Sequence, residues 1–285
     1  MLHQWAWSET SLILDLFTRE QGRIAVVAKG AKRPYSQLRP VLMPFQRLLV
    51  LTTRPKSEEG ADILTLRSAE YAGGGATLPP AQLFSGFYLN ELLLKLLARG
   101  DPHEQLFDAY GDTLWALTQT EDESPLRAFE LLLLRETGVL PDLGRCTGTQ
   151  SPVLPVRAYQ LRADAGLMAT SADAANAANA AAEPARSLGL SGATCLALQA
   201  ALDRSDMAAL RSAAGAELPA LKSQLRALLV YHLGSPTLRT RQMMLDVRRL
   251  LDQAGAAASA SAAAKIDQVA AATPTPEPSA LTGPP

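Results

Sequence analysis

The sequence predicts an α+β protein in which a small five-stranded barrel precedes a mostly α-helical domain. Three observations predict this class. Residues 2–69 contain short runs of alternating or continuous apolar side chains, a pattern typical of β-strands. From residue 82 onward, apolar residues recur at the spacing of amphipathic helices. The three glycines at 73–75 separate the two patterns and mark the expected domain boundary.

Length and composition are those of a soluble globular protein. The 285 residues suffice for about two domains with a real core. With 47% apolar residues and a net charge of −1, the total charge does not by itself indicate DNA. Cys146 and Cys195 lie far apart, which fits a reducing cytosol. Because neither a signal peptide nor an apolar run of roughly 20 residues is visible, we expect a cytoplasmic protein.

Five short strands are expected in the first 75 residues. They comprise residues 2–7, 12–18, 23–28, 45–53 and 62–69. The second and third flank a turn at Gly22, as in a β-hairpin. This strand number and size match an OB-fold barrel, whose strands and loops bind oligonucleotides. The pattern equally allows an SH3-like barrel.

Helices are expected over most of the remaining chain. They comprise residues 82–99, 104–118, 126–137, 192–202, 207–212, 218–233 and 240–253. Ser124 is the expected N-cap of the third helix, with Pro125 beginning it. A hairpin is expected around residues 159–161 and 167–168. The last helix gathers Met243, Met244 and Val247 on one apolar face.

The expected domains follow from these patterns. Residues 1–75 form the OB-fold nucleic-acid-binding domain, and residues 78–254 form the helical domain. A low-complexity insertion rich in alanine interrupts the helical domain near residues 171–186. Residues 255–285 are rich in Ala, Ser and Pro and are expected to be a disordered tail.

Positive charge is concentrated between residues 19 and 56, where nine cations face one acid, Glu20. The cations are Arg19, Arg23, Lys29, Lys32, Arg33, Arg39, Arg47, Arg54 and Lys56. Such a cluster favours contact with nucleic-acid phosphates, although a solvated basic surface is the alternative. The expected DNA-binding residues are Arg19, Arg23, Lys29, Lys32, Arg33 and Arg39.

Some of these residues have a second explanation. Arg19 and Arg23 flank the hairpin turn and are equally well explained as charges at a turn. Residues 29–44 contain Pro34, Pro40 and Pro44, so they form a loop rather than a central strand. Tyr35 in this loop is a candidate for stacking on a base, but a single tyrosine more often serves packing.

No catalytic or metal-binding constellation is present in the sequence. The histidines His3, His103 and His232 are isolated from one another, and neither cysteine has a neighbouring histidine. There is no phosphate-binding loop, dinucleotide fingerprint or zinc-protease motif. We therefore expect a protein that is not an enzyme and that needs no cofactor and no metal. An enzyme ranks third among the functions considered.

Short blocks of sequence carry a family resemblance. They are WSETSL at 7–12, LDLFT at 14–18, GR at 22–23, VAKGA at 27–31, LMPF at 42–45, LRSAE at 66–70, YLNELL at 88–93, LRAFEL at 126–131 and LRTR at 238–241. In this order they resemble the RecO family of DNA repair and recombination mediator proteins. No single block is specific, but the ordered set over residues 1–253 is.

The resemblance implies an OB-fold, a helical domain and action without catalytic turnover. It implies a nucleoid-associated protein that binds single- and double-stranded DNA and anneals complementary strands. It also implies work with the RecR protein to load the recombinase onto strands coated by single-stranded-DNA-binding protein. In the family the helical domain receives the acidic, Phe-ended C-terminal tail of that coating protein, which requires a cation beside an apolar pocket.

Three departures from the family pattern are visible, one of which is that the Ala-rich insertion and the C-terminal tail look like additions. The chain begins where the family's first strand is already under way, so a shortened first strand or a late start codon is expected. Some relatives carry a four-cysteine zinc site after the third helix, whereas here that region contains only Cys146.

The expected residues for binding the partner tail are Arg127, Arg239 and Arg241. Arg127 is equally well explained by an ion pair with Glu130 within the helix. For Arg239 and Arg241 a solvated helix face is the first explanation, and contact with DNA or the tail is the second. The alternative function is an OB-fold adaptor that binds an acidic protein without touching nucleic acid.

Overall fold

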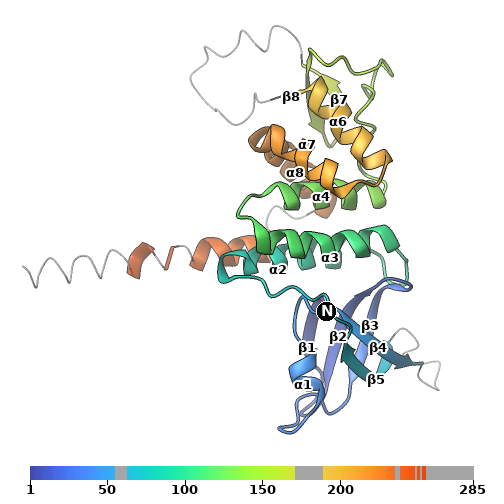
Figure 1. Cartoon of the computed structure of the whole chain (residues 1–285), viewed down its shortest axis with the longest axis vertical. Helices are drawn as coiled ribbons and strands as arrows, with labels where there is room; N and C mark the ends of the chain where they lie inside the picture. Colours follow the sequence, from blue (N-terminus) through green and yellow to red (C-terminus); the bar gives the residue numbers. More distant parts are fainter. Residues whose placement is uncertain (55–62, 171–188, 235–237, 248, 251, 255–285) are drawn as a thin grey trace, which may run out of the picture. The chain divides into compact units, whose positions relative to one another are not determined.

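The computed structural model describes residues 1–54, 63–170, 189–234, 238–247, 249–250 and 252–254 (Figure 1). The expected insertion near residues 171–186 and the expected tail at 255–285 lie outside the described residues. Residues Met1–Leu238 form one compact unit and Arg239–Pro285 a second, and each is described by itself. The boundary expected near residue 75 lies inside the first unit and stays a prediction.

The N-terminal part of the first unit is a five-stranded mixed sheet. Its strands are β1 (His3–Ala6), β2 (Leu12–Thr18), β3 (Gly22–Ala28), β4 (Leu48–Thr53) and β5 (Ile63–Tyr71). Their order is β1-β2-β3-β5-β4, and every neighbouring pair is antiparallel except β3 and β5, which are parallel. A short helix, α1 (Leu38–Val41), lies between β3 and β4. The predicted class, an α+β protein with an OB-fold before helices, is confirmed.

Alternation along the strands separates the two faces of this sheet. Leu14, Leu16 and Val26 are buried in a small core on the inner face. Asp15 and Phe17 alternate with them and lie on the outer face. Phe17 belongs to the core of the helices, and its ring lies 5.5 Å from that of Phe107. The outer face of β2 and β3 is therefore partly covered by the helical region.

Several strand boundaries differ from the sequence prediction, most of all the start of the fourth strand and the end of the fifth. The fourth strand begins at Leu48 rather than at residue 45, because Phe45 has a φ of 64°, which a strand cannot continue. The Phe45 ring instead packs 5.1 Å from the ring of Phe87. The fifth strand runs on to Tyr71, which pairs with Leu48. The two-residue strand β8 (Leu190–Ser191) was not predicted.

The helical region is built around one buried helix. Its elements are the 3-10 turn η1 (Pro80–Gln82), α2 (Leu83–Leu96), α3 (Glu104–Gln119), α4 (Ser124–Glu136), β6 (Ala158–Arg162), β7 (Gly166–Ala169), α6 (Gly192–Asp203), α7 (Met207–Ala216) and α8 (Leu218–Leu233). Helix α4 contacts α3, α7 and α8, and all its residues from Pro125 to Leu134 are buried. Figure 1 shows it between α3 and the α7–α8 pair. A helix surrounded in this way must be apolar or internally paired on every face.

Helix ends also depart from the prediction, and the largest differences are at α2, α4 and α7. The N-cap of α4 is Glu123, so Ser124 is the first helical residue rather than the cap. Helix α2 ends at Leu96 instead of residue 99, because Leu97 is extended. Helix α7 continues to Ala216, beyond the predicted residue 212. In the second unit, residues 239–247 are helical, and the side chains of Met243 and Met244 are exposed.

Within the part of the chain that the structure describes, no helix has the length and apolar character needed to cross a membrane. Among the same residues, no group of three or more His, Cys, Asp or Glu side chains could hold a metal ion.

Candidate nucleic-acid interface

The six cations predicted to bind DNA fall into two groups at opposite ends of the β2–β3 hairpin. Arg19 and Arg23 lie at its turn, whereas Lys29, Lys32, Arg33 and Arg39 follow the last residue of β3. A strand of the length of β3 spans roughly 20 Å. The six residues therefore do not form one cluster. We call the first group the turn end and the second group the free end.

At the turn end, Arg19 is held by two acids of helix α3. Its Nη1 lies 2.9 Å from Oε2 of Glu104, and its Nη2 lies 3.3 Å from Oδ2 of Asp108. The hydrogen bond and the charge of Asp108 raise the pKa of Arg19. The ion pairs are about half exposed, so each contributes little to stability. They nevertheless direct Arg19 toward the helices.

Arg23 belongs to a more buried arrangement. Asp15 is almost completely buried, with Nε of Arg23 3.7 Å from its Oδ1 and Nη2 of Arg99 3.3 Å from its Oδ2. Arg23 also donates from Nη1 to the carbonyl oxygen of Leu94. Burial raises the pKa of Asp15, and the charges of Arg23 and Arg99 oppose that shift. Arg23 is thus engaged by the fold, and its role in DNA binding stays a prediction.

Gly22 allows the hairpin turn to dock on the loop between α2 and α3. Its φ is 62°, and a Cβ atom built on it would lie 1.8 Å from the carbonyl oxygen of Asp101. The backbone N–H of Gly100 donates to the carbonyl oxygen of Arg23 at 3.0 Å. Only glycine combines this backbone conformation with so close an approach. The turn end is therefore fixed to the helices by backbone contacts as well as by charges.

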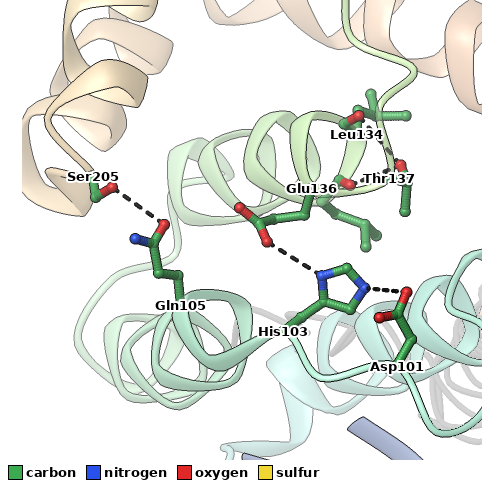
Figure 2. A network of polar contacts seen from close by, with 8 residues as sticks. Asp101, His103, Gln105, Leu134, Glu136, Thr137 and Ser205 are labelled. Atoms are coloured by element: carbon green, nitrogen blue, oxygen red, sulfur yellow. Dashed lines mark hydrogen bonds and ion pairs between the residues drawn. The ribbon is translucent and has the colours of Figure 1, made fainter.

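A polar network fixes the same loop to helix α4 (Figure 2). Nδ1 of His103 lies 3.2 Å from Oε2 of Glu136, and Nε2 lies 3.4 Å from Oδ2 of Asp101. Figure 2 shows the imidazole ring between the two carboxylates. No catalytic partner of His103 was predicted from the sequence, and its contacts here join the loop to α4. The α2–α3 loop thus connects the turn end to the buried helix.

The free end is organised by a series of backbone turns. The N–H groups of Ala31, Arg33, Ser36 and Arg39 donate to the carbonyl oxygens three residues before them, at 3.1–3.5 Å. These turns carry Lys29, Lys32, Arg33 and Arg39 on one short compact segment, residues 28–39. All four side chains are exposed. Within the described ranges of the chain, none of them forms an ion pair with an acid.

This segment rests on the loop between β1 and β2. The backbone N–H of Lys32 donates to the carbonyl oxygen of Thr10 at 3.0 Å, and its Nζ donates to that of Ser8 at 2.9 Å. In OB-folds this loop is one of those that bind oligonucleotides. The basic segment therefore lies beside a loop position that suits a nucleic-acid ligand.

Two exposed tryptophans, Trp5 in β1 and Trp7 in the loop that follows it, were not predicted as site residues from the sequence. Trp5 is 42% exposed and Trp7 is 64% exposed. Trp5 pairs with Ile13 across β1 and β2, and its ring lies 4.5 Å from that of His3. The alternation of His3, Trp5 and Trp7 was a usable signal, since residues two apart share a face of a strand. Tyr35, the predicted stacking residue, is also exposed.

The residues predicted to bind the partner tail lie in different environments. Arg127 is buried, and its Nη1 lies 3.0 Å from Oε2 of Glu130 in the same helix. Tyr88 donates to the other oxygen of Glu130 at 2.5 Å, and burial raises the pKa of this carboxyl group. The ion pair within the helix is therefore present, and contact of Arg127 with a tail stays a prediction. Arg239 and Arg241 lie in the second unit, and their role also stays a prediction.

A pocket of about 400 Å³ lies where α3, α4 and α7 meet. Trp115 and Pro125 supply apolar surface, and Arg211 supplies a cation. Trp115 is exposed. The lining also contains polar side chains and one acid, Asp122. The apolar surface and the cation are the features that an acidic peptide ending in an aromatic residue requires.

The regions of this chain that match known proteins extend over nearly the whole first unit. The family model described as "Recombination protein O N terminal" matches residues 1–72, and that described as "Recombination protein O C terminal" matches residues 80–242. The DNA repair protein RecO of Acidovorax ebreus is 48% identical over 264 residues, covering 88% of this chain and 95% of the relative. That of Verminephrobacter eiseniae is 48% identical over 256 residues, with the same coverage. That of Polaromonas sp. is 46% identical over 256 residues, again with this coverage.

Proposed function

The chain belongs to the RecO family of DNA repair proteins, and we propose that it is a recombination mediator that binds DNA through the free end of its OB-fold. It anneals complementary single strands and helps to load the recombinase onto strands coated by single-stranded-DNA-binding protein. It does this in the cytoplasm at the nucleoid, without catalytic turnover.

The observation that carries the proposal is the difference in charge partners along the hairpin. Lys29, Lys32, Arg33 and Arg39 are exposed, and no described acid neutralises them. Phosphate contacts from such cations release counterions and supply most of the affinity of non-specific DNA binding. Trp5 and Trp7 offer faces on which bases can stack without sequence preference. Together they provide the two contacts that a single strand needs.

The same cations would also promote the annealing of two strands. Two complementary strands repel each other through their phosphates before they pair. Lysines and arginines that hold both backbones lower this repulsion and raise the local concentration of each strand. Arg19 and Arg23, which lie at the turn end, mainly hold the sheet on the helices in this proposal.

The helical region receives the partner tail. We place the acidic, Phe-ended tail of the single-stranded-DNA-binding protein in the pocket of Trp115, Pro125 and Arg211. The guanidinium of Arg211 would meet the acidic residues, and the apolar wall would bury the terminal ring. The partnership with the RecR protein rests on the family resemblance, and no surface is assigned to it.

The test replaces Lys29, Lys32 and Arg33 together by alanine. The matched control replaces Arg157, Arg162 and Arg204, which are equally exposed but lie on the helical region. Binding to a labelled single strand is measured between low and physiological salt. If all three residues contact phosphates, the slope of log affinity against log salt should fall by about 2.

The control should keep the slope of the unchanged protein. An unchanged affinity and slope for the Lys29, Lys32 and Arg33 variant would overturn the assignment of the free end. If the unchanged protein fails to retain the oligonucleotide at low salt, the adaptor that binds an acidic protein becomes the better function.

A further inference from the structure

The outer face of strand β4 is apolar, but its side chains pack into neither hydrophobic core. Leu49 is 69% exposed and Leu51 is 61% exposed, although both lie within a regular strand. Their neighbours in sequence, Leu48 and Val50, point inward and pack against the barrel core. Deleting the two outer leucines would therefore cost the fold little, so the folded chain by itself gives no reason for them.

Strand β4 is also an edge of the sheet. It pairs with β5 along one side, and no described residue pairs with its other side. Half of its backbone N–H and C=O groups are thus available to a further strand. Exposed apolar edge strands readily pair with other chains, and proteins usually avoid them. An edge of this kind is well suited to receive an extended peptide.

Charge identifies the kind of partner. Arg47 precedes the strand and Arg54 follows it, and both are exposed. Arg67 lies on the neighbouring strand, where its Nε donates to Oγ1 of Thr53 at 3.3 Å. The apolar strip thus has a cation at each end, and one exposed acid, Glu70, lies opposite Leu49 on β5.

We propose that β4 accepts an extended segment of a partner protein as an additional strand of the sheet. The segment has alternating apolar residues, which cover Leu49 and Leu51, and acidic residues at its ends, which meet Arg47 and Arg54. Its main chain supplies the hydrogen bonds, and the side chains supply the specificity. This surface is separate from the DNA-binding free end and does not depend on that function.

A second copy of this chain fits the strip less well. Antiparallel self-pairing can place Leu49 opposite Leu51 of the other copy, which is favourable for the leucines. The same register places Arg47 of each copy opposite Thr53 of the other and one position from Arg54, so like charges lie close together at both ends. A nucleic acid is also a poorer occupant, because β4 carries no aromatic ring for a base to stack on. Tyr71, opposite Leu48, lies on the other face and donates to the carbonyl oxygen of Pro40.

The test uses the full chain and a fluorescein-labelled peptide, Glu-Asp-Val-Thr-Val-Thr-Val-Asp-Glu. Anisotropy measures its binding, and amide hydrogen exchange reports which backbone groups become protected. Binding with protection at residues 48–53 is expected. Leu49→Ser with Leu51→Ser should weaken binding about tenfold or more. The control, Leu154→Ser with Val156→Ser, changes exposed apolar residues elsewhere and should bind like the unchanged chain.

Charge reversal makes the test sharper. The variant with Arg47→Glu and Arg54→Glu should no longer bind the acidic peptide. It should instead bind a version of the peptide whose acidic ends are replaced by lysines. The leucine variant should keep its affinity for single-stranded DNA. The proposal is overturned if neither peptide binds at low salt or if protection appears away from residues 48–53. It is also overturned if sedimentation shows a dimer that the leucine variant abolishes, or if that variant loses DNA binding.

Discussion

The two ends of the β2–β3 hairpin carry the same residue types but have different surroundings. At the turn end, Arg19 meets Glu104 and Asp108, and Arg23 meets Asp15. At the free end, Lys32 donates only to backbone carbonyl oxygens, and its side chain donates to that of Ser8. A cation's role therefore depends on which acids the fold brings to it from elsewhere in the chain. Counting charges along the sequence does not reveal this difference.

The largest expected effect comes from undocking the turn end. Gly22→Val should lower the free energy of unfolding by about 4 kcal/mol, because the side chain would overlap the Asp101 carbonyl and strain a positive φ. Urea unfolding measures the change. Gly74→Val is the control, since Gly74 also has a positive φ but no neighbour within 4 Å, and it should cost much less. Equal costs would mean that docking at Gly22 contributes nothing.

The next effect comes from removing the buried acid. Asp15→Ala should destabilise the fold by about 3 kcal/mol, because Arg23 loses its buried partner. Combining it with Arg23→Met should recover part of this loss, because the more buried cation is then removed and only the half-exposed Arg99 is left without its acid. Chemical unfolding of the single and double variants checks the prediction. A double variant that is less stable than Asp15→Ala alone would contradict it.

The raised pKa of Asp15 predicts how this contribution varies with pH. Between pH 3.8, the ordinary pKa of an aspartate in the unfolded chain, and the higher pKa of Asp15 in the folded protein, the native state binds the proton of Asp15 more tightly than the unfolded state does. Stability therefore falls as pH rises through this window. Asp15→Asn removes the titrating group, so its unfolding free energy should change less over the same window. Parallel urea titrations of the two proteins test the sign, and identical slopes would refute it.

At the free end, the effect should appear in binding rather than in stability. Trp7→Ala should weaken single-stranded DNA binding by about 2 kcal/mol, the size of one base stacked on an aromatic ring. Unfolding free energy should hardly change, because the ring is exposed. Trp115→Ala, which removes an exposed tryptophan of the helical region, is the matched control for the anisotropy titration. Equal losses from both variants would mean that the Trp7 site is not specific.

The smallest effect is expected for Arg19→Ala. Exposed ion pairs contribute little to stability, so the loss of stability should be close to the error of measurement. Lys32→Ala should reduce DNA affinity more than Arg19→Ala does, because Arg19 already has acidic partners. The two single variants, titrated with the same oligonucleotide, compare the two ends directly. The opposite ranking would assign DNA to the turn end.

Local patterns predicted most of the fold. Strand β2 and helix α8 have the predicted bounds, because apolar spacing is a property of neighbouring residues. Strand β8 could not be predicted, since two residues contain no period and its place depends on pairing with β6. The fourth strand began late because Phe45 takes a positive φ that its residue type does not suggest.

The candidate site was less predictable for a related reason. Asp108 is 89 residues from Arg19 in the chain, and no pattern in the sequence connects them. The spacing of Arg127 and Glu130 did suggest an ion pair, but its complete burial follows from helices α3, α7 and α8 around it. Trp5 and Trp7 were visible as alternating residues, but only the exposed loop beside Lys32 makes them candidates for binding.

The docking of Gly22 on the α2–α3 loop has a mechanical consequence. The turn of the hairpin is an anchor point, because its backbone is bonded to the α2–α3 loop, whereas the exposed cations of the free end follow the opposite end of β3. Under the proposed function, a pull by DNA on the free end would be a load on this anchor point. Because His103 joins the α2–α3 loop to helix α4, that load would reach the helical region through the loop.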